Sequence, residues 1–388
     1  MKTAAVIAEY NPFHNGHSRH LKEARALTGA DFVMAVMSGD FVQRGAPAVF
    51  HKYMRTRMAL LSGADLVLEL PVQVSLSSAE GFAAGGVGIL SALCDTLCFG
   101  AEHPKATDFF ATAEALLSNR FSFFLREELA AGVSFPRARQ AALERMGMES
   151  GLLVSPNDIL GVEYAKAILA GGKRMKLEPI FRGGDYHADV ADRSDPSATS
   201  LRKLFREGGD WTPYVPNPEI FRGAALHTLE AGERAVLAKL RSMDEAEFEA
   251  LPYGSEGLWR KFQTACEQER TIEDILEATK SKRYTRTRLN RMLLCAFLGL
   301  TDRDMKQAAP YVRLLGLSEE GGRLLRARKN SFIVNAGERK RCPYEERERK
   351  FSALYGLFAL DATEGPVRRG QVVFPSGFPS VQGQKDVL

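Results

Sequence analysis

The feature that most constrains this fold is a short apolar run that leads into a glycine-containing turn and then into a helix-like segment. The apolar run is Thr3–Ala8, the turn covers residues 10–17, and the helical pattern covers residues 18–27. A strand, a tight turn and a helix in this order aim backbone N–H groups and the positive end of a helix dipole at one point. The sequence therefore predicts an anion-binding site directly after the first strand.

The turn carries two histidines three residues apart, His14 and His17, with Gly16 between them. An imidazole can donate to phosphate oxygens as negative charge builds up on them. We therefore interpret the turn as a site at which pyrophosphate leaves the α-phosphate of a nucleotide. The alternative is a helix start capped by Asn15, in which both histidines are incidental. The position directly after the first strand favours the nucleotide site.

Apolar runs and helical patterns alternate through the first part of the chain. This alternation predicts an α/β fold with a doubly wound parallel sheet. In such sheets ligands bind at the carboxyl ends of the strands, where the strand order reverses, so residues 10–17 would lie in that crevice. The expected strands are Thr3–Ala8, 32–37, Leu66–Leu70, 96–100 and Lys176–Phe181, and the expected helices are 18–27, 52–62, 79–93, Ala106–Leu117 and 158–169.

The sequence changes character after residue 206. Gly208, Gly209 and the prolines 213, 216 and 218 mark a linker, and the patterns from there to about residue 325 are helical with no convincing strand. We therefore predict a catalytic domain at 1–206 with a helical insertion at about 106–150. A mainly helical domain would follow at 207–362, with a flexible tail at 363–388.

Charge and cysteine usage exclude several classes of protein. The net charge of +4 is too small to indicate nucleic acid by itself. The odd number of cysteines, five, argues against a disulfide framework. Cys94 and Cys98 are four residues apart without a second ligand pair, so we expect buried thiols and no protein metal site. With no signal peptide pattern and no long apolar run, we expect a cytoplasmic protein with no membrane association and no obligate protein partner.

Polar residues after the second strand would face the same crevice as the first turn. Asp40, Gln43 and Arg44 follow that strand, and Lys52 and Arg55 lie one turn apart on the next helix. A guanidinium matches carboxylate and phosphate geometry. We predict that Gln43 and Arg44 hold a carboxylate or phosphate and that Lys52 and Arg55 add charge to the same pocket. The alternative is a surface loop with solvated charges.

Later segments offer further contacts, each with a plain alternative. A glycine at the end of the fourth strand permits close approach of a ring or ribose, or simply ends the strand. The stretch 155–158 begins a helix, and its asparagine either caps that helix or binds ligand. The hydroxyl-rich stretch 197–202 is either a capping motif or a cradle for β- and γ-phosphate oxygens. The candidates are Gly100, Asn157, Ser197, Thr199 and Arg202.

The H-x-G-H turn, joined to a Ser/Thr-x-x-Arg helix start, resembles the nucleotidyltransferase superfamily that shares its core with class I aminoacyl-tRNA synthetases. The combination of E-Y-N-P-F-H-N-G-H, S-G-D-F-V-Q-R-G, F-G-A-E and S-P-N-D-I-L is similar to the bacterial tRNA(Met) cytidine acetate ligase family. The resemblance implies ATP contacts at Ile7, Ala8, Glu9, Tyr10, Asn11, Pro12, Phe13, His14, Asn15, Gly16, His17, His20, Gly100, Asn157 and Arg182. It also implies that the acyl group lies near Asp40, Gln43 and Arg44, with Lys52 as a further candidate. The phosphate motif of the superfamily has one more hydroxyl, at the position where this chain has Ala198. Which hydroxyls reach phosphate therefore stays open.

A basic segment in the helical part is the candidate RNA surface. Residues 280–291 hold six basic residues and one aromatic residue with no acid. Such clusters neutralise phosphates, and a tyrosine can stack on an unpaired base. A solvated helix face is the alternative. The predicted tRNA contacts are Lys280, Lys282, Arg283, Tyr284, Arg286, Arg288 and Arg291.

The resemblance implies an enzyme that activates acetate with ATP as acetyladenylate and acetylates the wobble cytidine of elongator tRNA(Met). We expect Mg²⁺ on the ATP phosphates, held by ATP oxygens and water. His14 and His17 would stabilise the departing pyrophosphate. Two other functions fit the residues: a small-molecule adenylyltransferase or carboxylate–amine ligase with the same core, and a non-catalytic tRNA-binding protein that senses ATP.

Overall fold

The computed structural model describes residues 1–181, 197–281, 283–309, 311–328, 333–334, 343–360 and 374–375 of the 388-residue chain. The predicted tail at 363–388 lies outside these residues, apart from 374–375. Among the described helices, none is long and apolar enough to cross a membrane.

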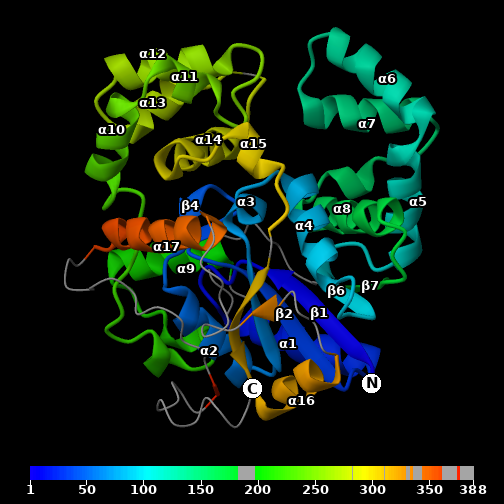
Figure 1. The fold of residues 1–388 in the computed structure, drawn as a ribbon. Coiled ribbons are helices and arrows are strands. Elements are labelled where there is room, and N and C mark those ends of the chain that lie inside the picture. The colour runs from blue at the N-terminus through cyan, green and yellow to red at the C-terminus, as the bar shows by residue number, and fades with distance from the viewer. Residues whose placement is uncertain are drawn as a thin grey trace.

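A mostly parallel sheet forms the centre of the molecule (Figure 1). Only the pairing of β5 with β8 is antiparallel in the described part of this sheet. The five strands expected from the sequence are all present, so the predicted doubly wound α/β fold is confirmed. The order across the sheet is β7 (Lys176–Phe181), β6 (Thr96–Ala101), β1 (Thr3–Ala8), β2 (Phe32–Ser38), β5 (Leu66–Leu70), β8 (Val312–Leu317) and β9 (Ile333–Val334).

The strands read as continuous apolar runs because helices cover both faces of the sheet. Alternate residues point to opposite faces: Ala4 and Val6 of β1 pack with α1 (Asn15–Thr28) and α2 (Lys52–Leu61). Ala5 packs into the core on the other face. The helices there are α4 (Ala79–Leu90), α5 (Ala106–Leu117), α8 (Pro156–Ala170) and α16 (Glu319–Ala327).

The strand order reverses at β1. From β1 the chain adds β2 and β5 on one side, and it then returns to the other side of β1 with β6 and β7. The crevice at the carboxyl ends of β1 and β6 is therefore the switch point at which α/β sheets bind ligands.

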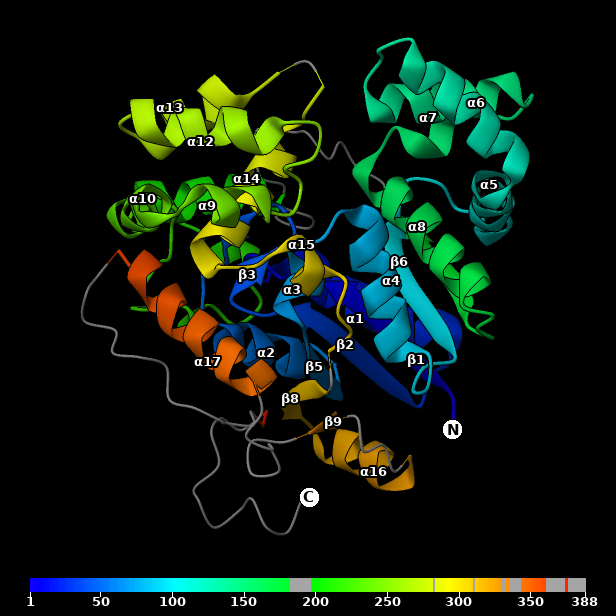
Figure 2. The same ribbon diagram turned by 45° about the horizontal axis from the view of Figure 1, so that its top comes forward.

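Two helical groups rise above this end of the sheet (Figures 1 and 2). The predicted insertion forms an arm of α6 (Asn119–Ala130) and α7 (Phe135–Arg145). The second group, residues 233–305, is called the helical lobe below. It comprises α10 (Glu233–Ser242), α11 (Glu245–Glu249), α12 (Leu258–Gln268), α13 (Ile272–Thr279), α14 (Arg286–Leu298) and α15 (Asp302–Met305).

The expected domain limits are wrong for the C-terminal part. Residues predicted to continue the helical domain to 362 return to the first domain, because β8 pairs with β5 and α16 packs on the sheet. The apolar run 312–317 is a strand pattern that Arg313 interrupts in the sequence. In the structure Arg313 is buried and pairs with Glu69 at 2.9 Å. Because its charge is paired, Arg313 can lie within a buried strand of the sheet.

A buried cluster of charges joins the C-terminal elements to the sheet domain. Lys52 Nζ lies 3.0 Å from Asp40 Oδ2 and 2.8 Å from Glu69 Oε1. Ser352 of α17 (Pro343–Tyr355) donates to the same Asp40 oxygen at 2.7 Å. Arg313 bridges Glu69 and, at 4.0 Å, Glu348. The cluster thus connects α2, β5, β8 and α17.

Burial and charge act in opposite directions within this cluster. Burial by itself would raise the pKa of the Asp40 carboxyl, but the charges of Lys52 and His51 hold it below its usual range. Burial raises the pKa of the Glu348 carboxyl to about 7, against the opposing effect of Arg313. Glu348 is therefore the member of the cluster that changes charge near neutral pH.

We expect Glu348 to make stability depend on pH. Its folded pKa lies above the ordinary value of 4.5, so its bound proton stabilises the folded state fully below about pH 4.5. This contribution is lost as the pH rises through about 7, and it amounts to roughly 3 kcal/mol at most. In urea denaturation, the stability of the wild type relative to Glu348→Gln should fall across this pH window. The exposed Glu245→Gln is the control, and parallel curves for wild type and Glu348→Gln would contradict the assignment.

Candidate active site

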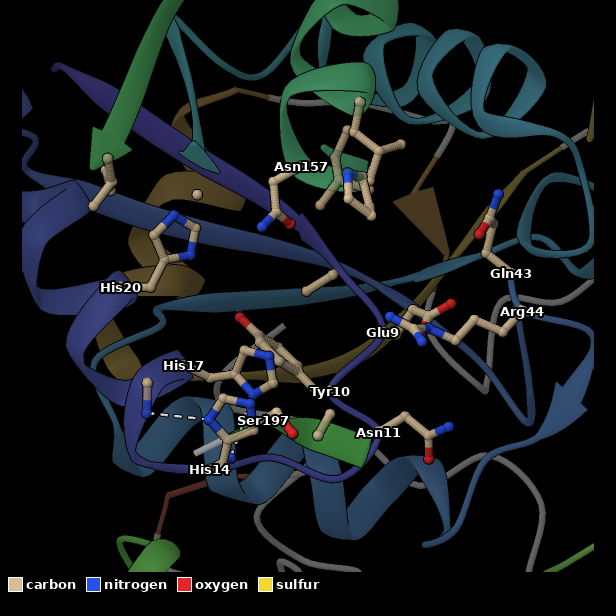
Figure 3. Close-up of a pocket in the computed structure, with 18 of the residues that line it drawn as sticks. Glu9, Tyr10, Asn11, His14, His17, His20, Gln43, Arg44, Asn157 and Ser197 are labelled. Carbon is tan, nitrogen blue, oxygen red and sulfur yellow. Dashed lines mark hydrogen bonds between the residues drawn. The ribbon is translucent and has the colours of Figure 1, made fainter. Parts of the chain in front are cut away.

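A cavity of about 380 Å³ opens at the switch point of the sheet. This size is typical of small-molecule sites. It lies at the ends of β1, β6 and β7, which contribute Ile7, Gly100 and Ile180 to its wall (Figure 3). Many of the residues predicted from the sequence line it: Ile7, Ala8, Glu9, Tyr10, Asn11, His14, Gly16, His17, His20, Gln43, Arg44, Gly100, Asn157, Ser197 and Arg202.

Three helices present their N-termini to this cavity. His14, Ser155 and Ser197 cap α1, α8 and α9 (Ala198–Glu207), and each cap side chain accepts a backbone N–H of the first turn. Lining residues come from all three starts, including Gly16, Asn157 and Ser197. Each helix contributes a partial positive charge at its N-terminus. Their convergence makes the cavity suitable for a multiply charged anion.

The two histidines form a stacked pair whose hydrogen bonds fix their orientation. Their ring centroids are 3.7 Å apart, with an angle of 28° between the planes. His14 Nδ1 accepts from the Gly16 N–H at 3.1 Å, and His17 Nδ1 accepts from the His14 N–H at 3.3 Å. Because both Nδ1 atoms accept, each neutral ring carries its proton on Nε2. The pair therefore supplies two Nε2–H donors beside the helix start.

A fully buried arginine holds the base of the cavity. Arg55 of α2 donates from Nη1 to the Glu9 carbonyl at 2.8 Å and to the Ser38 carbonyl at 2.9 Å. It also donates to the carbonyls of Phe50 and Gly39. Arg55 therefore fixes the carboxyl ends of β1 and β2 relative to each other. The prediction that it adds charge to the pocket is wrong, because its donors are directed at these carbonyls.

The helix α9 is fastened to the first turn. Arg202 donates from Nη1 to the Asn11 carbonyl at 2.7 Å and from Nη2 to Thr199 Oγ1 at 2.9 Å. The helix is anchored by its buried residues Leu201 and Phe205. Phe205 packs edge-on against Phe50. The hydroxyl-rich helix start predicted from the sequence is thus brought next to the H-x-G-H turn. Residues of both segments therefore line the same cavity.

Several predicted contacts have structural roles instead. Phe13 is buried in the core, and the Asn15 side chain donates to the Pro213 carbonyl at 3.0 Å. Neither these residues nor Pro12 and Thr199 are among those that line the cavity. Arg182 lies outside the described residues.

The expectation that Asp40 and Lys52 lie near the acyl group is wrong in the described structure. Both belong to the buried charge cluster, and neither lines the cavity. The side chains are turned inward because Glu69 and Ser352 offer buried partners that adjacent sequence does not reveal. Gln43 and Arg44, the other two acyl-end candidates, do line the cavity.

Sequence reasoning missed several residues of the cavity wall. Two are aromatic, Phe82 of α4 and Tyr164 of α8, and one is basic, Arg19 of α1. One signal existed for α4, whose sequence is rich in glycine and alanine. A Cβ at Gly86 would lie 2.5 Å from Ile7 Cδ1, so glycine allows the helix to pack close to β1 and bring Phe82 to the cavity. We find no comparable signal for Tyr164.

Comparison with known proteins identifies the family. The model of the HIGH nucleotidyl transferases matches residues 1–357. A tRNA(Met) cytidine acetate ligase of Acetivibrio thermocellus is 36% identical over 86% of this chain and 87% of the relative. A Geobacillus protein of the same name is 36% identical over 97% of this chain and 99% of the relative.

The chain belongs to the tRNA(Met) cytidine acetate ligase family of HIGH nucleotidyl transferases. The resemblance seen in the sequence motifs is thereby confirmed. The fold agrees: the apo structure of Thermotoga maritima TmcAL matches 96% of this chain at 31% identity with a TM-score of 0.87. A form of the same protein bound with alpha-thio ATP matches with a TM-score of 0.85.

The basic segment of this family member is largely paired with acids that lie outside the segment. Arg283 lies 3.0 Å from Glu256, and Arg286 contacts Glu273 and Glu277. Lys280 also pairs with Glu277 at 3.1 Å. Arg288 donates to the Tyr253 carbonyl, and Arg291 is buried. The segment therefore carries less uncompensated charge than its sequence suggests, and Lys282 is outside the described residues.

Lys52 provides a test of the corrected assignment. We expect Lys52→Met to lower the free energy of unfolding by about 3–5 kcal/mol, because it leaves two buried carboxylates without their partner. Lys22→Met, on an exposed position of α1, should change it by less than about 0.5 kcal/mol. Both values follow from urea denaturation. A Lys52→Met protein of normal stability that fails to activate acetate would instead restore Lys52 to the acyl site.

Proposed function

We propose that this chain is a tRNA(Met) cytidine acetate ligase. It would activate acetate with ATP and transfer the acetyl group to the wobble cytidine of elongator tRNA(Met), giving N(4)-acetylcytidine. The observation that carries this proposal is the convergence of three helix N-termini and two Nε2–H donors on one cavity. Family membership over almost the whole chain supports the particular acid and acceptor. Because the substrate is a tRNA, we place the enzyme in the cytoplasm.

In the first half-reaction an acetate oxygen attacks the α-phosphorus of ATP. A new P–O bond forms as the bond to the β-phosphate oxygen breaks, which gives acetyladenylate and pyrophosphate. Negative charge moves onto the pyrophosphate, where His14, His17 and the N-terminus of α1 would stabilise it. No side chain acts as a nucleophile, so positioning and electrostatics account for the acceleration.

Two polar residues of the cavity wall suit the acetate end. Figure 3 shows the Arg44 side chain extending into the cavity on the side of Glu9, with Gln43 beside it. A guanidinium would orient the acetate carboxylate before attack. The apolar residues Phe82 and Tyr164 line the same cavity and would exclude water from the adenylate.

In the second half-reaction the exocyclic amine of the cytidine attacks the acetyl carbonyl. The C–N bond forms, the C–O bond to phosphate breaks, and AMP leaves with the oxygen that came from acetate, while the amine nitrogen releases one proton to solvent. The cytidine must leave its stack to reach the cavity. The tRNA contacts predicted at residues 280–291 would guide it from the helical lobe.

Magnesium would accompany the ATP phosphates. No group of three His, Cys, Asp or Glu side chains in the described part of the chain is arranged as metal ligands. Glu9 and Glu23 are carboxylates of the cavity wall and would hold the water shell of a phosphate-bound ion. The ion would neutralise phosphate charge, which is the chemistry it supplies in phosphoryl transfer.

Substitutions at His14 separate helix capping from catalysis. An asparagine can replace Nδ1 as a helix cap but has no equivalent of Nε2. We therefore expect His14→Asn to retain wild-type stability and to lose roughly 10²–10³-fold in acetate-dependent ATP–pyrophosphate exchange, as for loss of one oxyanion donor. His14→Ala should lose both properties. Exchange close to wild type in His14→Asn would refute the donor role.

The acceptor is tested by mass analysis of tRNA nucleosides. After incubation with ATP and acetate, elongator tRNA(Met) should contain N(4)-acetylcytidine, and initiator tRNA should not. Pyrophosphate exchange without any acetylated nucleoside would favour a small-molecule ligase. Tight binding of ATP and tRNA without exchange would favour a protein that only senses ATP.

A further inference from the structure

The helical lobe contributes none of the described residues that line the cavity. It nevertheless contacts two segments that carry lining residues or lead directly to them. One is the turn 43–45 between β3 (Phe41–Val42) and β4 (Ala46–Pro47), which carries Gln43 and Arg44. The other is the connection from α3 (Val72–Ser75) to α4, which leads to Ala79 and Phe82. These segments connect the lobe to the cavity wall.

Arg291 of α14 lies at the junction of both segments. Its Nη1 donates to the Gln43 carbonyl at 3.3 Å, and its guanidinium lies 5.2 Å from the centre of the Tyr253 ring. Tyr253 in turn donates from Oη to the Leu76 carbonyl at 2.6 Å. Gln43 Nε2 donates to the Ser77 carbonyl at 3.4 Å, which joins the two segments directly. One buried side chain therefore braces both parts of the wall.

The turn is pressed against the backbone of α14. Gly45 has a φ of +76°, and a Cβ at this position would lie 2.5 Å from the Arg291 nitrogen and 2.6 Å from the Asn290 carbonyl carbon. Only glycine fits both the conformation and the space. Figures 1 and 2 show the β3–β4 hairpin beside α14, in agreement with the contact between α14 and β4. The position of Arg44 is therefore set by α14.

We propose that Arg291 is a positioning residue for acetate activation that acts through the turn 43–45, and that it is not an RNA contact. The residue is only 8% exposed, so little of it is available to a phosphate. Its bond to the Gln43 carbonyl fixes the residue adjacent to Arg44, the proposed acetate ligand. The proposal rests on the proposed function, because it requires that acetate be activated in this cavity.

The test is a double-substitution cycle measured without tRNA. We compare acetate-dependent ATP–pyrophosphate exchange in the wild type, Arg291→Ala, Arg44→Ala and the double variant. Arg291→Ala should lose roughly 10- to 100-fold in kcat/KM for acetate, since a misplacement of about 1 Å can cost up to 10²-fold. The double variant should be no worse than Arg44→Ala, because Arg291 acts through Arg44. Loss of stability alone would instead add to the loss in Arg44→Ala.

The matched control is Arg270→Ala, which changes an exposed basic residue of the same helical lobe. It should leave exchange unchanged, and the Kd of Arg291→Ala for tRNA should equal that of the wild type. Normal exchange with weakened tRNA binding in Arg291→Ala would overturn the proposal, as would additive losses in the cycle. If thermal denaturation shows that Arg291→Ala does not fold, Arg291→Lys takes its place in the same cycle. Absence of exchange in the wild type would refute the proposed function instead.

Discussion

The buried guanidinium of Arg55 is the interaction on which the site depends. It is fully buried and donates to carbonyls at the ends of β1 and β2. Hydrogen bonds from a charged donor contribute about 1.5–3 kcal/mol each, which offsets the cost of burying the charge. Because the two strand ends are fixed, the turns that follow them have fixed starting points. The H-x-G-H turn and the loop with Arg44 therefore face one crevice.

Residues that are neighbours in the sequence after β2 have two different roles, one in the interior and one at the cavity. Lys52 and Asp40 hold α2, β5 and α17 together in the interior, whereas Gln43 and Arg44 face the cavity. A similar division occurs in α14, where Leu289 and Leu293 form the lobe core and Arg291 reaches the hairpin. The helical lobe is consequently part of the active-site scaffold as well as the proposed RNA platform.

Local pattern was sufficient to predict the elements around the cavity. Buried parallel strands give continuous apolar runs, and the turn after Ala8 contains the glycine and both histidines, so β1 and α1 follow from neighbouring residues. The pairing of Arg313 with Glu69 joins residues far apart in sequence, and this is why β8 was missed. The acids that pair with residues 280–291 include Glu256, which lies outside the segment and which no local reading associates with Arg283. The burial of Lys52 was equally impossible to predict from neighbouring residues, since its partners include Glu69 and Ser352.

The central claim is that an acetate oxygen attacks the α-phosphorus of ATP in this cavity. The most direct measurement follows the oxygen atoms, with acetate labelled with ¹⁸O in the complete reaction with ATP and tRNA. The account predicts AMP that contains one ¹⁸O, because the acetate oxygen bonded to phosphorus leaves with AMP. Unlabelled AMP, or ADP with ¹⁸O in inorganic phosphate, would show attack at another phosphorus and contradict the account.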